Sequence, residues 1–307
     1  MMRKTVVALM ALASIAMATA PAAPFPVMAW QDEGHVLVNQ VAAEHLPDEM
    51  PQFFREAVDS LAYLGPEPDR WRRNTEYSLK ESQEPDHFIK LEILDVDLDT
   101  LRSRYDYFRM LYERRASPHA RRGLHPDSLL PERVGLLPYI TIEEYERLKV
   151  AFRQYRQLVA SGGDTELVEG NVILYAGWLG HYVADAANPH HTSVHYDGWQ
   201  GDNSEGYAGP GIHARFEGNF LRSAGIRAED ISDRLGPPKL LRDPFADFLS
   251  LIYESQGMVE DTYRLDKDGG FEGVGTERGL EFTLERLTAG SQMLLDLWHT
   301  AWMTSVD

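Results

Sequence analysis

Cysteine is absent from this chain of 307 residues. No disulfide can therefore stabilise it, and its fold must depend on core packing or on bound metal. Beyond the N-terminal region, no run of residues is long and apolar enough to be a membrane-spanning helix. The sequence also lacks GxGxxG, Walker and GxSxG motifs, which leaves nucleotide-cofactor and serine-hydrolase functions without support.

Positive charge is scarce as well. The chain has 30 lysine and arginine residues against 48 aspartate and glutamate residues, a formal net charge of -18. This balance argues against a basic surface that coats nucleic acid, although a few metal ions in one cleft would reverse the local potential. With 43% hydrophobic and 10% aromatic residues, the chain can bury a sizeable core, so a globular protein is expected.

Residues 1–29 have the pattern of a secretory signal peptide. The positively charged start MMRK precedes the apolar run TVVALMALASIAMA, which is too short to span a bilayer. Ala29 ends a small-residue pattern that suits cleavage, although Ala20 and Ala22 are also small. Cleavage after Ala29 would make Trp30 the first residue of a mature domain of residues 30–307, which we expect to be secreted or periplasmic.

Apolar residues recur every three or four positions in six segments, which predicts an all-α fold. The segments are 34–46, 51–64, 141–160, 166–188, 244–265 and 279–302. Between the fourth and the fifth lies a glycine-rich stretch, residues 189–212, which predicts a long loop. Loops of this length in compact domains usually carry function.

Two pairs of metal-binding residue types flank this loop. His181 and Asp185 are four positions apart and share one helix face, as do His213 and Glu217. Proline at position 189 ends the first helix and lets His191 turn back towards it. Imidazole and carboxylate groups at this spacing suit zinc, but a single pair is more often structural, for example an ion pair on a helix surface.

The order of these residues resembles that in one superfamily, which contains zinc-dependent bacterial phospholipases C and the single-strand-specific zinc nucleases of fungi and plants. The matching pattern is Trp30-x4-His35, Asp69, His87-Phe88, His181-x3-Asp185-x5-His191 and His213-x3-Glu217. The resemblance runs from Trp30 almost to the C-terminus, where ERLTAGSQMLLDLW is similar to the last helix of the family. The resemblance implies a single, mostly helical domain around a cleft that holds three zinc ions (Zn2+).

The resemblance also implies how the three ions are held. One ion would be bound by Asp69, His87, His181 and Asp185, and a second by His191, His213 and Glu217. The third would be bound by His35, by a bridging Asp185 and by the α-amino nitrogen and carbonyl oxygen of Trp30. His190 is an alternative to His191. Asp69 is also the candidate catalytic residue, which would orient the attacking water or accept its proton.

The implied reaction is hydrolysis of a phosphodiester by a hydroxide that bridges two zinc ions. Glu217, where the nucleases usually have Asp, and the lack of cysteine favour a phospholipase C-like enzyme. The spacing from Trp30 to His35 instead resembles the nucleases, which release 5′-nucleotides. The expected partner is therefore phospholipid, with contact to a membrane surface, or single-stranded nucleic acid. An exported, zinc-stabilised protein without activity is the third alternative.

Three aromatic residues of the loop are candidate substrate contacts. Tyr196, Trp199 and Tyr207 could stack on a base, or contact acyl chains or a choline-like head group. Packing of the loop against the core is an equally expected role for them.

The predicted N-terminal ligand gives a first test. Addition of one residue before Trp30 removes the free α-amino group at that position, so we expect it to lower the zinc content by about one ion per chain. Atomic absorption on the purified protein measures this, with a one-residue extension after Asp307 as the control. Unchanged zinc content would count against an N-terminal ligand.

Overall fold

The structure is a computed structural model that describes residues 32–72 and 75–306. It is all-α, which confirms the fold class predicted from the sequence periodicity. Within those residues the only strand-like pairing is one isolated antiparallel bridge between Ile89 and Gly135. No helix in this part of the chain is both long and apolar enough to cross a membrane. The predicted signal peptide and Trp30 lie outside the described residues.

The α-helices differ widely in length. In chain order they are α1 (Glu33–Glu44), α2 (Gln52–Arg55), α3 (Val58–Leu64), α4 (Glu67–Arg70), α5 (Tyr77–Gln83), α6 (Arg104–Ala116), α7 (Pro131–Val134), α8 (Leu137–Ser161), α9 (Glu166–Ala187), α10 (Ile212–Ala214), α11 (Leu221–Ala224), α12 (Ala228–Ser232), α13 (Pro244–Gly257), α14 (Val259–Lys267) and α15 (Glu277–Met303).

Shorter helical segments connect them. Five are 3-10 helices, namely η1 (Glu84–His87), η2 (Leu91–Ile93), η3 (Leu98–Thr100), η4 (Pro126–Leu129) and η5 (Pro189–Thr192). The sixth, η6 (Arg215–Phe220), is a π-helix between α10 and α11. Single turns of π-helix are rare in proteins, and those that do occur lie frequently at functional sites.

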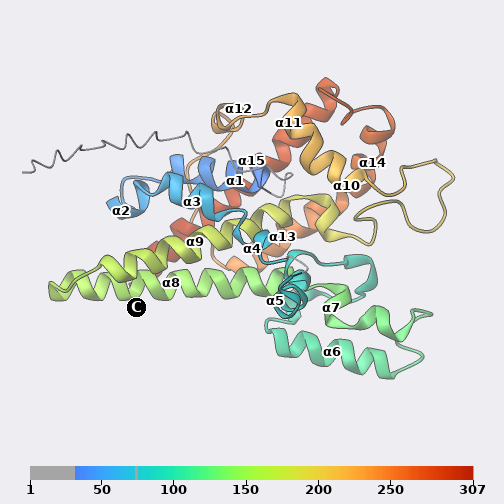
Figure 1. Cartoon of the computed structure of the whole chain (residues 1–307). Helices are drawn as coiled ribbons and strands as arrows, with labels where there is room; N and C mark the ends of the chain where they lie inside the picture. Colours follow the sequence, from blue (N-terminus) through green and yellow to red (C-terminus); the bar gives the residue numbers. More distant parts are fainter. Residues whose placement is uncertain (1–31, 73–74, 307) are drawn as a thin grey trace, which may run out of the picture.

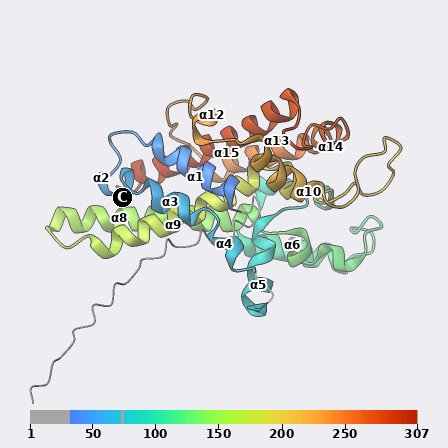
Figure 2. The same cartoon turned by 45° about the horizontal axis from the view of Figure 1, so that its top comes forward.

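Helix α9 is the centre of the fold. It packs against α8 along its length and also contacts α1, α3 and α15. Figures 1 and 2 show α8 and α9 side by side, with α1 and α3 on the other side of α9. A continuous apolar core joins the helices from α1 to α15, and a smaller one lies beneath the loop that follows η5.

The predicted helical segments correspond to observed helices, with two differences. Segment 51–64 contains two helices, because the backbone of Ala57 leaves the helical conformation between α2 and α3. Segment 244–265 also contains two, because α13 ends at Gly257, a residue type that weakens helices, and α14 begins at Val259. The predicted loop contains one short helix, η5, at its start.

Glycine allows α1 and α9 to approach closely near the cleft. A Cβ atom added at Gly180 would lie 1.8 Å from Oδ1 of Asn39, which α1 contributes. Asn39 is fully buried, and its amide donates hydrogen bonds to the carbonyl oxygens of Leu61 and Gly177 at 2.8 and 3.0 Å. Its side chain therefore has no free space into which to move, and glycine at position 180 sets the separation of the two helices.

Two glycines of α9 allow a matched test of this contact. We expect Gly180→Ala to lower the free energy of unfolding by about 2 kcal/mol or more, because it forces apart well-packed helices. The added methyl group of Gly170→Ala meets no atom within 4 Å, so this variant should raise stability by about 1 kcal/mol through helix propensity. Urea unfolding measures both values. A stabilised Gly180→Ala variant would contradict the packing described here.

Candidate metal centre

An open cleft of about 940 Å³ lies where α1, α4, α9 and η1 come together with the segments on either side of the long loop. Its floor contains most of the side chains predicted as metal ligands: His35, Asp69, His87, Asp185, His191, His213 and Glu217. His181 lies directly beneath them and is fully buried. All eight predicted ligands within the described residues are therefore gathered at one place.

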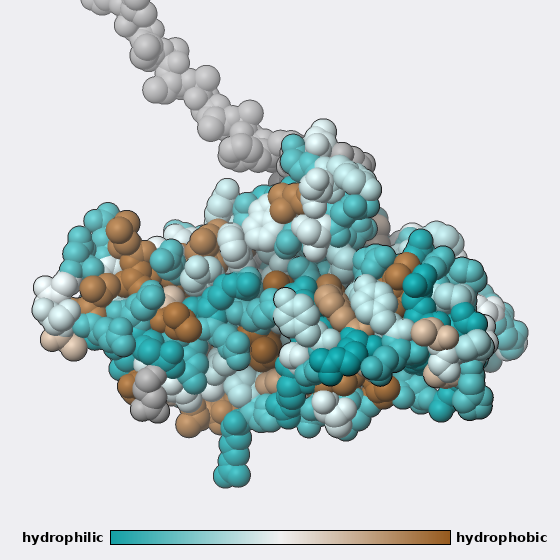
Figure 3. All heavy atoms as spheres, turned by 90° about the horizontal axis from the view of Figure 1, so that it is seen from below, coloured by the Kyte–Doolittle hydropathy of each residue, from teal (hydrophilic) through white to brown (hydrophobic). Residues whose placement is uncertain are grey.

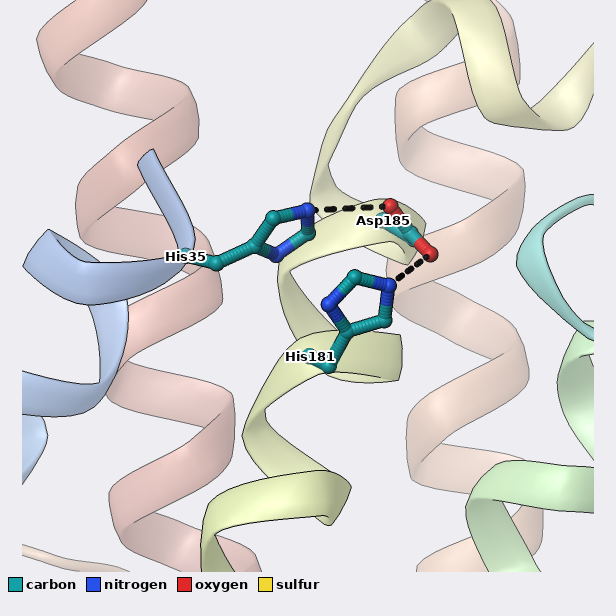
Figure 4. A group of neighbouring side chains, drawn as sticks. All are labelled: His35, His181 and Asp185. Atoms are coloured by element: carbon teal, nitrogen blue, oxygen red, sulfur yellow. Dashed lines mark ion pairs between the residues drawn. The ribbon is translucent and has the colours of Figure 1, made fainter. Parts of the chain in front are cut away.

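The first group of donors joins α1 to α9. Figure 4 shows His35 on α1 pointing towards His181 and Asp185 on α9. Nε2 of His35 lies 3.5 Å from Oδ1 of Asp185, and Nε2 of His181 lies 3.3 Å from Oδ2 of the same carboxylate. The two imidazole rings stack with their centres 3.9 Å apart. The spacing of His181 and Asp185 within one helix thus places both on the cleft side of α9.

The second group adds the residues from upstream in the sequence. Asp69 comes from α4 and His87 from the end of η1. Nδ1 of His87 lies 2.9 Å from Nε2 of His181, 3.1 Å from Oδ2 of Asp185 and 3.7 Å from Oδ1 of Asp69. His181 therefore belongs to both the first and the second group.

The third group lies on the two sides of the loop. Oε1 of Glu217 is 2.7 Å from Nε2 of His191 and 2.7 Å from Nε2 of His213. It also accepts a hydrogen bond from the side-chain amide of Asn188. Glu217 lies in η6, one turn after His213, and His191 lies in η5 immediately after α9. The end of α9 and the π-helix thus converge on one carboxylate oxygen.

Backbone carbonyl groups orient three of the histidine rings. Nδ1 of His181 donates to the carbonyl oxygen of Gly65 at 2.8 Å, and Nδ1 of His213 donates to that of Tyr196 at 3.0 Å. Nδ1 of His191 donates to the carbonyl oxygen of His87 at 2.6 Å. Because a carbonyl oxygen only accepts, Nδ1 of each ring carries a proton and Nε2 faces the cluster. Hydrogen bonds of this kind are typical around metal-ligating histidines.

Burial and neighbouring charges divide the cluster into neutral and ionised groups. Burial, with the adjacent His181, lowers the pKa of His35 to about 3 and keeps its ring neutral. Burial opposes ionisation of Asp185, but His191 and His181 outweigh it and hold the pKa of that carboxyl well below its usual range. Burial raises the pKa of Asp69, while His181 and Arg72 lower it. Burial lowers the pKa of His181 and His191, but Asp185 and the other acceptors around the two rings together outweigh it, so that the pKa of His181 is raised and that of His191, which also faces Glu217, is raised to about 10. Since metal ions bind neutral imidazoles and ionised carboxylates, a metal ion would displace the Nε2 protons of these rings.

The residues present fit zinc. Zinc takes imidazole nitrogen and carboxylate oxygen at about 2.0–2.2 Å, which sets the donors of a tetrahedral site about 3.3 Å apart. Neighbouring donor atoms here lie 2.7 to 3.9 Å apart, and the donor atoms of each group all lie within 4.8 Å of one another. Three carboxylates gathered at the floor of one cleft also require positive charge to offset their desolvation. We therefore conclude that these buried groups could bind metal.

The structure brings the predicted ligands together in three groups, and their assignment to particular metal ions stays a prediction. Asp69, His87 and His181 form one group, and His191, His213 and Glu217 form another. In the third predicted set, His35 and Asp185 lie together with His181, while Trp30 lies outside the described residues. His191 rather than His190 approaches Glu217. The His190 ring is fully buried, with its centre 5.6 Å from that of His213.

The three predicted aromatic contacts do not lie together in the cleft. Tyr196 is half exposed and lines it. Trp199 and Tyr207 instead pack against Tyr263, with ring centres 5.2 and 5.8 Å from that ring. The indole of Trp199 donates to the carbonyl oxygen of Asp202, within the loop itself. These two residues hold the loop on the small second core.

Two polar residues of the site were not predicted. Asn188, at the end of α9, donates to Glu217 and accepts from the backbone N–H of His190 at 3.0 Å. Its place directly before Pro189 is a typical helix-capping signal and could have identified it. Arg72 lines the cleft and donates from Nη1 to Oδ1 of Asp69 at 2.9 Å. Its position three residues after Asp69 gave only a weak signal.

Comparisons with known proteins give little beyond this geometry. No model of a known protein family matches the chain, and no curated protein matches it. Among solved structures, the crystal structure of alpha-toxin from Clostridium perfringens, avian strain SWCP, is similar at a TM-score of 0.35 and 12% sequence identity. The match covers 91% of this chain and 64% of the toxin chain, so the chain spans less than two thirds of that protein.

Removal of a shared donor tests the metal centre. We expect His181→Ala to lower the zinc content by at least about one ion per chain, because this residue contributes to two groups. Atomic absorption gives the stoichiometry, and circular dichroism checks that the variant is folded. His119→Ala, at an exposed position away from the cleft, is the control. A folded His181→Ala protein with full zinc content would exclude these groups as the binding site.

Proposed function

We propose that the protein is a zinc-dependent phosphodiester hydrolase with three zinc ions. The observation that carries this proposal is the convergence of eight imidazole and carboxylate side chains in three groups at the floor of an open cleft. Zinc held there would act as a Lewis acid and make water nucleophilic near neutral pH. The order of these residues along the sequence, which resembles that of the zinc phospholipases C and nucleases, supports the same assignment.

The exposure of the donors favours a catalytic role over a purely structural one. A structural zinc site is closed by protein ligands, whereas a catalytic site keeps positions for water and substrate. Here the side chains of His213, Glu217 and Asp69 are 25%, 12% and 11% exposed, and all three line the cleft. His35 of the first group is likewise 11% exposed and lines the cleft, so a substrate there would reach all three groups directly.

Hydrolysis requires a proton acceptor at the attacking water. The oxygen of water bonds to phosphorus, the bond from phosphorus to the leaving oxygen breaks, and one proton passes from the water to the leaving group. We assign the acceptor role to Asp69, since its Oδ1 is held by Arg72 while its Oδ2 faces the cluster 3.9 Å from Nε2 of His35. Burial raises the pKa of this carboxyl, which strengthens it as a base.

Arg72 has a second use in this arrangement. Its guanidinium group holds Asp69 and also lines the cleft, where it can donate to a phosphoryl oxygen. The phosphate of the substrate would then lie between Arg72 and the metal ligands. Phospholipid and single-stranded nucleic acid are the two substrate classes that the sequence resemblance implies.

We also propose that the protein is exported and is secreted or periplasmic. The support for this proposal is the sequence of residues 1–29, with its charged start, apolar run and small residues before Trp30.

The shared carboxylate gives the sharpest test of the proposed activity. We expect Asp185→Asn to lower hydrolysis of bis(p-nitrophenyl) phosphate at least about 100-fold, because a neutral amide binds zinc more weakly than a carboxylate does. Chelation of the wild-type protein should have the same effect, and added zinc should reverse it. Asp59→Asn, on the exposed side of α3, is the control. Full activity in Asp185→Asn, or activity that survives chelation, would refute the proposal.

A further inference from the structure

A half-buried lysine without a carboxylate partner faces the cleft. Nζ of Lys90 lies 4.9 Å from the ring centre of Phe88 and 5.4 Å from that of Tyr196, and all three residues line the cleft. Among the described residues, no carboxylate lies within ion-pair distance of this ammonium group. Burial, and then the charge of Arg133, lower the pKa of Lys90, while Glu92 raises it. Partial burial of an unpaired cation is unfavourable unless an anion binds there.

Main-chain hydrogen bonds fix Lys90 relative to the metal ligands. The backbone is extended at Phe88, so alternate side chains point to opposite sides. Phe88 and Lys90 consequently line the cleft, while Ile89 is fully buried. The N–H of Ile89 donates to the carbonyl oxygen of His191 at 2.8 Å. Lys90 is therefore three residues from one predicted ligand, His87, and its segment is bonded to another.

Glycine at position 135 allows α7, which carries Arg133, to approach the segment of Phe88 and Lys90. These three residues form what we call the Lys90 wall of the cleft. Gly135 has a φ of +103°, and a Cβ atom there would lie 2.0 Å from the carbonyl oxygen of Phe88. The N–H of Lys90 donates to the carbonyl oxygen of Val134 at 2.8 Å. Arg133 thus lines the cleft near Lys90, and it too has no ion-pair partner among the described residues.

The acidic residues of the cleft do not neutralise this wall. Glu81, Glu84 and Glu132 line the cleft but are exposed to water, which weakens their fields. Oδ1 of Asp197 accepts from the N–H groups of Gly211 and His213, at 2.6 and 3.3 Å, and is occupied within the loop. Among the described charged groups on this side of the cleft, the ammonium group of Lys90 is therefore the one that is half-buried and has no carboxylate partner.

We propose that Lys90, assisted by Arg133, binds a second phosphate next to the scissile phosphodiester, and that the substrate is accordingly single-stranded nucleic acid. This inference rests on the proposed phosphodiesterase function. A diester bond inside a nucleic acid strand is flanked by further phosphates. Phosphatidylcholine carries only the scissile phosphate and a quaternary ammonium, which is bound by aromatic faces. In this cleft an ammonium group already lies over both aromatic faces and would repel a second cation.

The surface of the described residues favours the same choice. A phospholipase must contact a lipid surface, for which one apolar face is the usual means. Three of the most exposed apolar side chains are Leu167, Tyr105 and Val274. They belong to the start of α9, to α6 and to the connection between α14 and α15, and Figure 1 shows these elements at different ends of the molecule. The face shown in Figure 3 is mostly hydrophilic, with apolar residues in separate small areas.

Dinucleotides with and without an additional phosphate test the subsite. The substrates are d(TpT) and the same compound with a terminal phosphate on its 5′ or its 3′ side, so the scissile bond stays the same. We expect the wild-type protein to prefer one of the two phosphorylated forms by about tenfold in kcat/KM, the effect of one charged hydrogen bond. K90M should abolish this preference and K90R should retain it, because the charge is kept.

A lysine elsewhere provides the matched control. Lys149, on α8, is also half-buried but does not line the cleft, so K149M changes the net charge equally and should keep the preference. A ratio between two substrates is insensitive to a general loss of folded protein. Absence of any preference in the wild type, or an equal preference in K90M, would overturn the proposal. So would faster release of phosphocholine from phosphatidylcholine vesicles than of nucleotides from single-stranded DNA.

A binding measurement separates this inference from the proposed activity. If the protein hydrolyses neither bis(p-nitrophenyl) phosphate nor any dinucleotide, the hydrolase function is refuted. The phosphate subsite is then tested separately, by the affinity of the protein for a bisphosphate. For that purpose, thymidine 3′,5′-bisphosphate is titrated into chelator-treated protein by calorimetry. We expect K90M to raise the Kd about tenfold and K149M to leave it unchanged. Equal Kd values in wild type and K90M would overturn the subsite whatever the activity.

Discussion

The carboxylate of Asp185 is the group on which the rest of the site depends. It is 2% exposed, and its two oxygens lie 3.1 to 3.5 Å from ring nitrogens of His35, His87, His181 and His191. A buried carboxylate is stable only when charge or hydrogen bonds offset its lost hydration. His181 lies on the same helix as Asp185. The other three histidines come from three other segments of the chain. The need to compensate one charge therefore ties α1, η1 and η5 to the end of α9, and the close glycine contact between α1 and α9 makes the approach possible.

Much of the donor set was predictable because helical spacing is a local property. His181 with Asp185, and His213 with Glu217, needed only the four-residue period to be placed on one side of the chain. His35, Asp69 and His87 could not be placed by spacing, since they reach the cluster through contacts distant in sequence; only the resemblance to a known ligand order assigned them. The contribution of Asn188 and the carbonyl groups that orient the rings depends on how α9 ends, which becomes visible only in three dimensions.

The fold was predictable where apolar periodicity is strong and not elsewhere. The segments that became α8, α9 and α15 carry long regular patterns, since each buries one or more faces in the core. Helix α6 had no such signal, because its sequence RYDYFRMLYERRA is rich in charge and buries only Tyr107 and Leu111. It is stabilised instead by a cap, in which Ser103 accepts from the N–H of Asp106 at 3.1 Å. The extended segment of Phe88 and Lys90 is held by hydrogen bonds to distant backbone, which no local pattern encodes.

The net charge of -18 constrains how an anionic substrate can be bound. The long-range field of such a chain repels a polyphosphate, so electrostatic steering does not assist association. Attraction must arise within the cleft, over distances shorter than the screening length of about 8 Å at physiological ionic strength. Lys90 and Arg72 supply fixed positive charge there, and bound zinc would supply more. Moderate salt would screen the unfavourable long-range field more strongly than the contacts in the partly buried cleft. An acidic chain with a few fixed cations in its cleft would therefore recognise an anionic substrate only after that substrate has entered the site.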